Sequence, residues 1–199
     1  MTSVADGGPS AQGARLVFAV IVWGAAVTVT LARLWHYETE PGARADAPPQ
    51  WPAGSAVALD PRRCTVVMFV HPRCPCTAAS LAELRRLASD HESVATTVLF
   101  HLPADADRDW HEASSWHAAR SIAGVAVRAD VDGAEATRFG ALTSGHVVIY
   151  APTGELRFSG GITNARGHVG ENLTATAAIR RDAGCAEAPV YGCALAEPR

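Results

Sequence analysis

Two cysteines separated by a single residue, Cys74 and Cys76, are the residues of this chain best placed for chemistry. Residues 64–70 before them are apolar and β-branched, over a length typical of a buried strand. Pro72 disfavours a helical backbone at the residue before it, so the strand ends there. After Cys76 the apolar residues recur at helical spacing. The cysteines therefore lie at a helix N-terminus, where backbone N–H groups and the helix dipole favour a thiolate.

A thiolate is the nucleophile of thiol–disulfide exchange. Arg73 adds a positive charge beside Cys74, and Pro75 suits the first turn of a helix because its missing N–H costs nothing there. Two cysteines with one residue between them can close a small, strained disulfide that is easily reduced. We therefore predict that Cys74 attacks a disulfide and that Cys76 resolves the mixed disulfide. The alternative, two structural cysteines, gives no reason for the neighbouring prolines.

Two histidines are candidate partners for this thiolate. His71 lies three residues before Cys74, and a protonated imidazole there would stabilise the thiolate; alternatively, it fills the top of the sheet. His146 opens a later strand and is either a proton partner of Cys74 or a sheet-edge residue without a role. A glycine-rich loop precedes Arg166 and His168, and this loop could bring His168 toward the cysteines.

Three further cysteines make the total five, so at least one is unpaired, reactive or intermolecular. Cys64 opens the predicted strand, where a cysteine commonly serves as a small core residue. Cys185 and Cys193 lie in the C-terminal tail, and we first expect a disulfide between them that pins this tail. The alternative is that Cys193 folds back and resolves Cys74 or Cys76.

The elements that must position these residues alternate along the chain. Predicted strands cover residues 64–70, 94–102, 125–129, 146–151 and 155–159. Predicted helices cover residues 74–90, part of 105–123, 131–139 and 167–182. This order predicts an α/β domain with a mixed central sheet flanked by helices.

At this point the sequence resembles a known group of proteins. The run His71-Pro72-Arg73-Cys74-Pro75-Cys76, with residues 159–163 and 191–193, resembles the thioredoxin superfamily and, more narrowly, the RedB-type thioredoxin-like proteins of bacteria. The resemblance covers about residues 50–199. It implies a thioredoxin-like fold, a redox activity on protein thiols or disulfides, and electrons supplied by a partner protein.

The resemblance also shows two departures. A helix and a strand, at about residues 105–129, are inserted after the second core strand, and they carry the pairs Trp110-His111 and Trp116-His117, which we interpret as surface packing. Thioredoxin-like folds place a cis-proline before the third core strand, facing the cysteines. Here Ser144-Gly145-His146 occupies that place without a proline, and we expect Thr143, Ser144 and His146 near Cys74.

The N-terminal part of the chain contains an uncharged apolar run, residues 16–32, bracketed by Arg15 and Arg33. With Trp35 at the interface, its length suits a membrane-spanning helix at residues 15–36. A cleaved signal peptide or a buried core helix is the alternative, but the run has almost no polar face. The flanking arginines nearly balance, so we choose a cytoplasmic N-terminus and an extracytoplasmic domain because an oxidising compartment suits the cysteines.

Around this helix we predict the remaining organisation: a disordered tail at 1–14, a linker at 37–52, the thioredoxin-like domain at 53–183 and a two-cysteine tail at 184–199. The formal net charge of −3 and the 48% hydrophobic content of the 199 residues argue against a nucleic-acid binder. No Gly-x-Gly-x-x-Gly pattern follows a strand, so no nucleotide cofactor is expected.

Two other functions remain open. Cys74 and Cys76 with His146, or with His71 or His168, would make a soft site for copper. Membrane-anchored copper chaperones of the Sco type combine a thioredoxin fold, two cysteines and a distant histidine, although their cysteine spacing is longer. The last alternative is a tethered binding domain with a vestigial site, which the missing proline favours.

Overall fold

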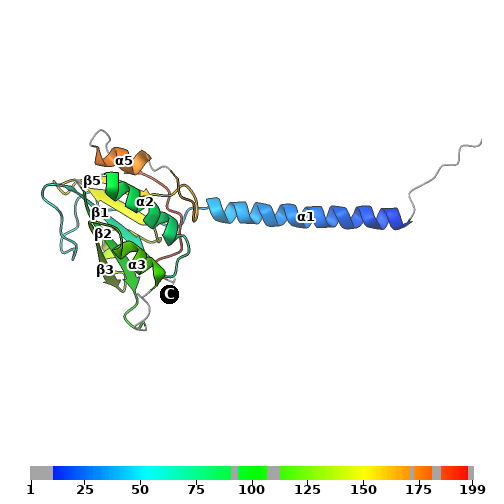
Figure 1. Ribbon diagram of the computed structural model, residues 1–199, viewed down its shortest axis with the longest axis horizontal. Helices are drawn as coiled ribbons and strands as arrows, with labels where there is room; N and C mark the ends of the chain where they lie inside the picture. Colours follow the sequence, from blue (N-terminus) through cyan, green and yellow to red (C-terminus); the bar gives the residue numbers. More distant parts are fainter. Residues whose placement is uncertain (1–10, 91–93, 107–112, 171–172, 181–184, 197–199) are drawn as a thin grey trace, which may run out of the picture. The chain divides into compact units, whose positions relative to one another are not determined.

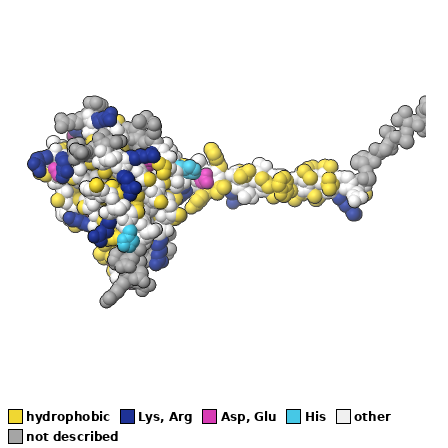
Figure 2. All heavy atoms as spheres, viewed as in Figure 1, with side chains coloured by type: hydrophobic (Ala, Val, Ile, Leu, Met, Phe, Trp, Pro, Cys, Tyr) yellow, Lys and Arg dark blue, Asp and Glu magenta, His cyan; other side chains and the backbone are white. Residues whose placement is uncertain are grey.

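The structure, a computed structural model, describes residues 11–90, 94–106, 113–170, 173–180 and 185–196. It divides into two units, residues 1–39 and 40–199, which are described separately. The first unit is helix α1, Ala11–Thr39, which includes the predicted span 15–36. Figure 2 shows apolar side chains along the visible side of α1. A helix of 29 residues is about 43 Å long, enough for a hydrocarbon core of about 30 Å. By length and composition α1 can cross a membrane, a test that a signal sequence also passes.

The second unit is built on one six-stranded mixed sheet, with strand order β3-β2-β1-β4-β5-β6. Its strands are β1 (Cys64–Val70), β2 (Val94–Leu102), β3 (Val125–Val131), β4 (His146–Tyr150), β5 (Leu156–Gly161) and β6 (Ala186–Glu187). Strands β1, β2 and β3 are parallel, and β4 runs antiparallel to both β1 and β5. The predicted mixed sheet is confirmed, and the element order is that of a thioredoxin-like fold with an inserted helix and strand.

Helices cover one face of the sheet (Figure 1). They are α2 (Thr77–Asp90), α3 (Ser114–Arg120) and α5 (Leu173–Ile179), whose apolar residues share a core with alternate residues of β1, β2 and β4. The other alternate residues face a second core with the short helix α4 (Ala134–Arg138). Because both faces are covered, β1 is buried along its length, which explains the continuous apolar run in its sequence.

The segment predicted as a linker belongs to this second core. Residues 40–59 carry no helix or extended strand, yet Trp51 packs edge-on against Phe139 and Tyr150, each with ring centroids 5.1 Å apart. The Tyr150 hydroxyl donates to the Pro48 carbonyl at 2.8 Å, and the Gly42 N–H donates to the Val190 carbonyl at 2.7 Å. The globular unit therefore begins more than ten residues before the predicted boundary at 53.

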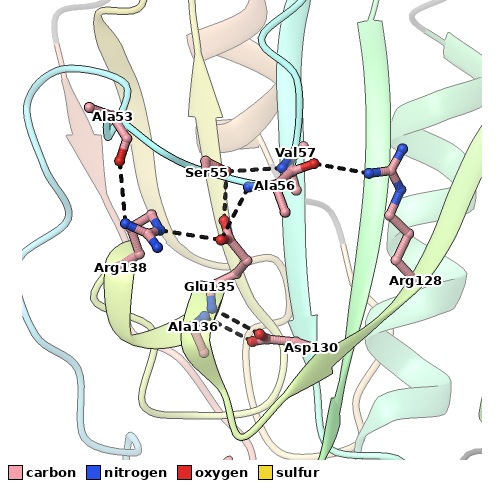
Figure 3. A network of polar contacts seen from close by, with 9 residues as sticks. All are labelled: Ala53, Ser55, Ala56, Val57, Arg128, Asp130, Glu135, Ala136 and Arg138. Carbon is pink, nitrogen blue, oxygen red and sulfur yellow. Dashed lines mark hydrogen bonds and ion pairs between the residues drawn. The ribbon is translucent and has the colours of Figure 1, made fainter.

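A polar network fastens the end of this segment to α4 (Figure 3). The buried Asp130 carboxylate accepts the N–H groups of Glu135, at 2.8 Å, and Ala136, at 2.9 Å, at the start of α4. The Glu135 carboxylate in turn accepts the Ser55 hydroxyl at 2.6 Å and the Arg138 guanidinium at 3.2 Å. The segment thus contributes a fixed layer of the fold.

The last helix and one edge of the sheet differ from the sequence prediction. The described helix α5 is Leu173–Ile179, and residues 167–170 of the predicted helix 167–182 are not helical, because the chain turns at Gly167, whose φ is +70°. Residues 171–172 and 181–182 lie outside the described residues. Strand β6 was not predicted; it is two residues long and pairs with β5. In the insertion, Trp116 packs against Phe100 with ring centroids 5.0 Å apart, while Trp110-His111 lies outside the described residues.

Candidate active site

The turn after β1 places Cys74 just before α2. The His71 N–H donates to the Ser144 hydroxyl at 2.9 Å, and the Cys74 N–H donates to the His71 carbonyl at 3.1 Å. Helix α2 begins at Thr77, whose N–H donates to the Cys74 carbonyl at 3.1 Å. The predicted location of Cys74, between a buried strand and a helix N-terminus, is thus the one in the structure, with the helix starting three residues later than predicted.

The C-terminal tail covers Cys74 from one side. The Cys193 N–H points at the Cys74 Sγ, with N and S 3.4 Å apart. The tail is held there by an antiparallel bridge to the loop before β4: the Ser144 N–H donates to the Cys193 carbonyl at 2.8 Å, and Thr143 pairs with Ala194. Gly192 lies so close to this loop that an added Cβ would be 2.0 Å from the Ser144 carbonyl oxygen.

Earlier tail residues follow β5 and account for its two glycines. The Ala188 N–H donates to the Ser159 carbonyl and the Gly161 N–H donates to the Pro189 carbonyl, both at 3.2 Å. A Cβ added to Gly160 would be 2.4 Å from the Ala188 carbonyl oxygen. The adjacent glycines therefore allow the tail to approach β5 closely, and this pair is the sequence signal that could have located the tail.

An arginine closes the site on the side of the glycine-rich loop. The Arg166 guanidinium donates to the Gly192 carbonyl and, at 3.3 Å, to the Glu40 carbonyl. The loop that carries Arg166 is tied to α2, because the Gly170 N–H donates to the buried Glu83 carboxylate at 3.0 Å. The sequence suggested His168 for this place, but the His168 ring hydrogen-bonds the Arg166 carbonyl and is exposed.

The surroundings of Cys74 stabilise its thiolate. Burial raises the pKa of the Cys74 thiol, but hydrogen bonds from the Cys193 thiol and N–H, the Cys76 N–H and the Ser144 hydroxyl outweigh burial, so the pKa lies below its ordinary value. The Cys76 N–H precedes the first turn of α2, as the helix-terminus argument predicted. Cys74 is only 5% exposed, so the sulfur is reached through a limited opening.

The other two thiols of this cluster are held in the protonated form. Burial, together with the neighbouring Cys74 charge, raises the pKa of Cys76, and Arg166 partly offsets this rise. Burial and the hydrogen bond to Cys74 raise the pKa of Cys193 to about 12. The cluster therefore combines one sulfur with a lowered pKa, Cys74, and two thiols with raised pKa values that can donate hydrogen bonds to it. We call Cys74, Cys76 and Cys193 the three-thiol cluster.

The predicted histidine partners have other contacts. His71 orders the turn, since its Nδ1 accepts the Arg73 N–H at 3.2 Å and its ring stacks on His101 with centroids 6.2 Å apart. His146 is completely buried, and its Nε2 lies 2.9 Å from the Ser159 hydroxyl. It lies on the face of β4 shared by Val148 and Tyr150, opposite the face covered by α2. Burial lowers the pKa of His146 to about 4.

The residues of the loop before β4 divide between these two neighbourhoods. Ser144 reaches the cysteine turn, where its hydroxyl lies 3.4 Å from that of Thr77. The Thr143 hydroxyl instead donates to the Ala43 carbonyl at 2.6 Å. No peptide bond among the described residues is cis. At the place where related folds carry a cis-proline, this chain has a serine that contacts the thiolate.

The predicted disulfide between the two tail cysteines is absent, and both are free thiols. Cys185 is exposed beside β6, and burial together with the Glu187 and Glu155 charges raises its pKa. Cys193 lies at the other end of the tail, beside Cys74. The chain between Cys185 and Cys193 therefore runs alongside β5, which keeps the two thiols apart. Cys64 packs at the margin of the first core, as predicted.

A cavity of about 600 Å³ opens on the side of Cys74 that the tail leaves uncovered. It lies between the first turns of α2 and helix α3 and is lined by Cys74, Ala78, Leu81, Arg85 and Ala118, among others. The inserted helix thus forms one wall, and the Ser115 hydroxyl fixes it to the cysteine turn by donating to the Pro72 carbonyl at 2.9 Å. A substrate that reaches Cys74 through this cavity would meet apolar walls and arginines.

The fold of residues 40–199 is thioredoxin-like, and solved structures with a similar fold exist. A scan of protein-family models and a search of curated proteins find no match. Among solved structures, a hypothetical protein from Sinorhizobium meliloti aligns with 20% identity over 78% of this chain and 93% of its own, with a TM-score of 0.57. An uncharacterized conserved protein from Geobacillus kaustophilus aligns with 19% identity over 80% and 93%, with a TM-score of 0.56.

A secreted disulfide oxidoreductase from Mycobacterium tuberculosis, described as homologous to E. coli DsbE, also aligns. Its identity is 17%, over 61% of this chain and 83% of that one, with a TM-score of 0.43.

Proposed function

We propose that this chain is a thiol–disulfide oxidoreductase in which Cys74 is the attacking thiol and α1 is a membrane anchor. The observation that carries the proposal is the set of hydrogen bonds that converge on the Cys74 Sγ, from the Cys193 N–H at 3.4 Å, the Cys76 N–H and the Ser144 hydroxyl. Such donors stabilise negative charge on sulfur, and the thiolate is the reactive form in exchange. As part of this proposal, we assign the chain to the RedB-type thioredoxin-like proteins that its sequence resembles.

The first step is attack by the Cys74 thiolate on one sulfur of a substrate disulfide. A bond forms between Cys74 and that sulfur, the substrate S–S bond breaks, and the second substrate sulfur leaves as a thiolate. A second thiol of the three-thiol cluster then displaces the bound sulfur, which leaves an oxidised protein and a reduced substrate. The cavity beside Cys74 admits a peptide loop, so protein thiols or disulfides are the substrate class that we propose.

Trapping of the mixed disulfide tests this function. The full chain in detergent micelles is mixed with a fluorescent peptide disulfide, and adducts are separated without reductant. We expect an adduct that Cys74→Ser abolishes and that the matched variant Cys185→Ser retains, because Cys185 lies outside the cluster. An adduct rate unchanged in Cys74→Ser, or no adduct at all, would contradict the proposal and favour a tethered binding domain.

The copper alternative needs a further ligand beside Cys74 and Cys76. His146 is directed to Ser159 on the opposite face of the sheet from α2, so it does not join Cys74 and Cys76. Within the described part of the chain, no three His, Cys, Asp or Glu side chains are grouped to hold a metal ion. Titration of the reduced chain with Cu(I) separates the two functions: tight binding that Cys76→Ser abolishes would favour copper.

A further inference from the structure

We propose that Cys193 is the resolving thiol of Cys74, and that the chain segment 192–195 is a docked strand whose role is to deliver it. The proposal rests on the proposed function, because a resolving thiol requires that Cys74 first forms a mixed disulfide. It replaces Cys76, the resolving thiol that the sequence predicted, and it gives the C-terminal tail a catalytic role.

The docking of residues 192–195 involves several specific contacts. Ser144 donates its N–H to the Cys193 carbonyl at 2.8 Å, and the Leu195 N–H donates to the Leu142 carbonyl at 2.9 Å. These bonds flank the Thr143–Ala194 bridge, so the tail adds a short antiparallel strand to the loop before β4. Leu195 is 3% exposed and belongs to the second core, which anchors the strand beyond Cys193.

The backbone of this segment is matched to its site by Gly192. An added Cβ would lie 2.0 Å from the Ser144 carbonyl oxygen, a separation that real Cβ atoms do not adopt. On its other side the Gly192 carbonyl accepts the Arg166 guanidinium. Gly192 is thus held between the Ser144 carbonyl and the Arg166 guanidinium. In this position of the backbone, the Cys193 N–H lies 3.4 Å from the Cys74 Sγ, measured from nitrogen to sulfur.

Geometry favours Cys193 over Cys76 as the partner of Cys74. A Cys74–Cys76 disulfide would close across a single proline, within a turn whose carbonyl at Cys74 already accepts the Thr77 N–H. Such a ring departs from relaxed disulfide geometry and stores strain. Cys193 approaches on a separate strand, so a Cys74–Cys193 bond would leave the turn intact.

The resolving step balances as follows. After the first attack, Cys74 is bonded to a substrate sulfur. The Cys193 sulfur then bonds to the Cys74 Sγ, the bond from Cys74 to the substrate breaks, and the substrate sulfur leaves with the electron pair. The proton of the Cys193 thiol ends on the departing substrate thiolate. Two protein thiols are oxidised to one disulfide while one substrate disulfide is reduced to two thiols.

The charge on Cys74 influences the pKa of Cys193, and this charge is lost when Cys74 enters the mixed disulfide. In the reduced protein the Cys193 thiol donates to the Cys74 thiolate, and this bond and the Cys74 charge, added to burial, hold the Cys193 pKa near 12. Once Cys74 is in a mixed disulfide, its charge is gone, so two of these causes disappear and the pKa of Cys193 falls. Burial still raises the pKa of Cys193, but its thiol is a better nucleophile once a substrate is bound to Cys74 than it is in the reduced protein.

Disulfide mapping identifies the resolving thiol directly. The full chain is oxidised with the same peptide disulfide, quenched in acid and cleaved with trypsin, which places Cys74 and Cys76 in residues 74–85 and both tail cysteines in residues 182–199. A second cleavage after Tyr191 separates Cys185 from Cys193. We expect a crosslink between residues 74–85 and Cys193 that persists in Cys76→Ser and is lost in Cys74→Ser.

Kinetics give a second readout. The mixed disulfide on Cys74 should persist roughly tenfold longer or more in Cys193→Ser, while Cys185→Ser should change its lifetime less than about twofold. Cys76→Ser should lengthen it less than Cys193→Ser does. Gly192→Val keeps the thiol but displaces the strand, so it should lengthen the lifetime in the same direction as Cys193→Ser.

The outcomes separate the two proposals. Adducts that resolve at an unchanged rate in Cys193→Ser, with only a Cys74–Cys76 bond in the map, would overturn the role of Cys193 and leave the oxidoreductase function in place. An absence of any Cys74 adduct, in the wild type and in all variants, would overturn the oxidoreductase function itself. Circular dichroism of each variant shows whether the fold is retained, and Gly192→Ala provides a milder displacement than Gly192→Val.

Discussion

At the scale of single residues, the lowered pKa of Cys74 depends on donors from three separate parts of the chain. The Cys193 thiol and N–H come from the tail, the Cys76 N–H from the start of α2 and the Ser144 hydroxyl from the loop before β4. Burial alone would raise the pKa of Cys74, so its lowered value depends on these contacts. Each donor can be removed separately by mutation or displacement.

Ser144→Ala should raise the pKa of Cys74. A hydrogen bond to a charged group contributes about 1.5–3 kcal/mol, so the midpoint of the alkylation rate against pH should move up by roughly one unit. The measurement is the rate of iodoacetamide labelling at Cys74 between pH 5 and 10. Ser115→Ala is the matched control, because the Ser115 hydroxyl donates to the Pro72 carbonyl and not to sulfur. Equal midpoints in wild type and Ser144→Ala would show that the hydroxyl does not stabilise the thiolate.

The sequence predicted the position of Cys74 at a strand–helix turn with Ser144 near it, but it did not predict Arg166 at this site. Cys74 and the adjacent helix start follow from local pattern, because strand length, proline placement and helical spacing are short-range signals. Arg166 and Cys193 lie 92 and 119 positions further along the chain, which no local pattern connects to Cys74. His146, a predicted candidate partner of Cys74, lies on the face of the sheet opposite α2, because side chains alternate along β4. Predicting this face required the exact register of the strand.

At the scale of elements, α2 and α3 define how a substrate can reach Cys74. Ala78→Trp places a large side chain on the exposed surface of α2 within the cavity. The rate of adduct formation with the peptide disulfide should fall by roughly tenfold, while iodoacetamide labelling of Cys74 should hardly change, because only the larger reagent needs the cavity. Ser89→Trp, at the other end of α2, is the control. Equal effects on both reagents would mean that the cavity is not the route.

The docked segment 40–59 depends on the network around Glu135. Glu135 is 7% exposed, and its carboxylate accepts hydrogen bonds from the Ser55 hydroxyl, the Ala56 N–H and the Arg138 guanidinium. Glu135→Ala leaves these donors unpaired, so the free energy of unfolding should fall by about 2–3 kcal/mol. Urea denaturation monitored by tryptophan fluorescence measures the loss, since Trp51 lies in the same layer. Glu155→Ala removes an exposed ion pair with Arg157 and should cost less than about 1 kcal/mol; comparable losses in both would refute the assignment.

Strands and helices were predictable where both faces of an element are buried or where its period is clear. The bounds of β1 and β2 agree with the sequence pattern residue for residue. Strand β6 and the docked segment were missed because neither has a hydrophobic period: one is two residues long, and the other is held by proline, glycine and backbone hydrogen bonds. Such segments become ordered only through tertiary contacts.

At the scale of the whole molecule, burial of His146 couples stability to pH. Its pKa is about 4 in the folded protein because of burial and the Arg44 charge, against about 6.5 in an unfolded chain. Between these values the unfolded state binds more protons, so the free energy of unfolding falls as the pH falls. We expect His146 to contribute a loss of about 2 kcal/mol between pH 7 and pH 5.

Urea denaturation at a series of pH values tests this contribution. His146→Gln should flatten the dependence between pH 7 and pH 5 whatever its effect on absolute stability. His101, whose pKa burial also lowers, adds a loss of the same sign that remains in the variant. A slope in His146→Gln as steep as in the wild type would show that His146 does not carry the effect.

The docked segment also differs from a flexible tether in what it lets the chain do. A flexible tether with the length of residues 37–52 would let the thiols explore a radius of roughly 20 Å around the end of α1. Here the Arg166 guanidinium donates to the Glu40 carbonyl and the Gly42 N–H donates to the Val190 carbonyl, so the segment from residue 40 onward belongs to the folded unit and is not such a tether.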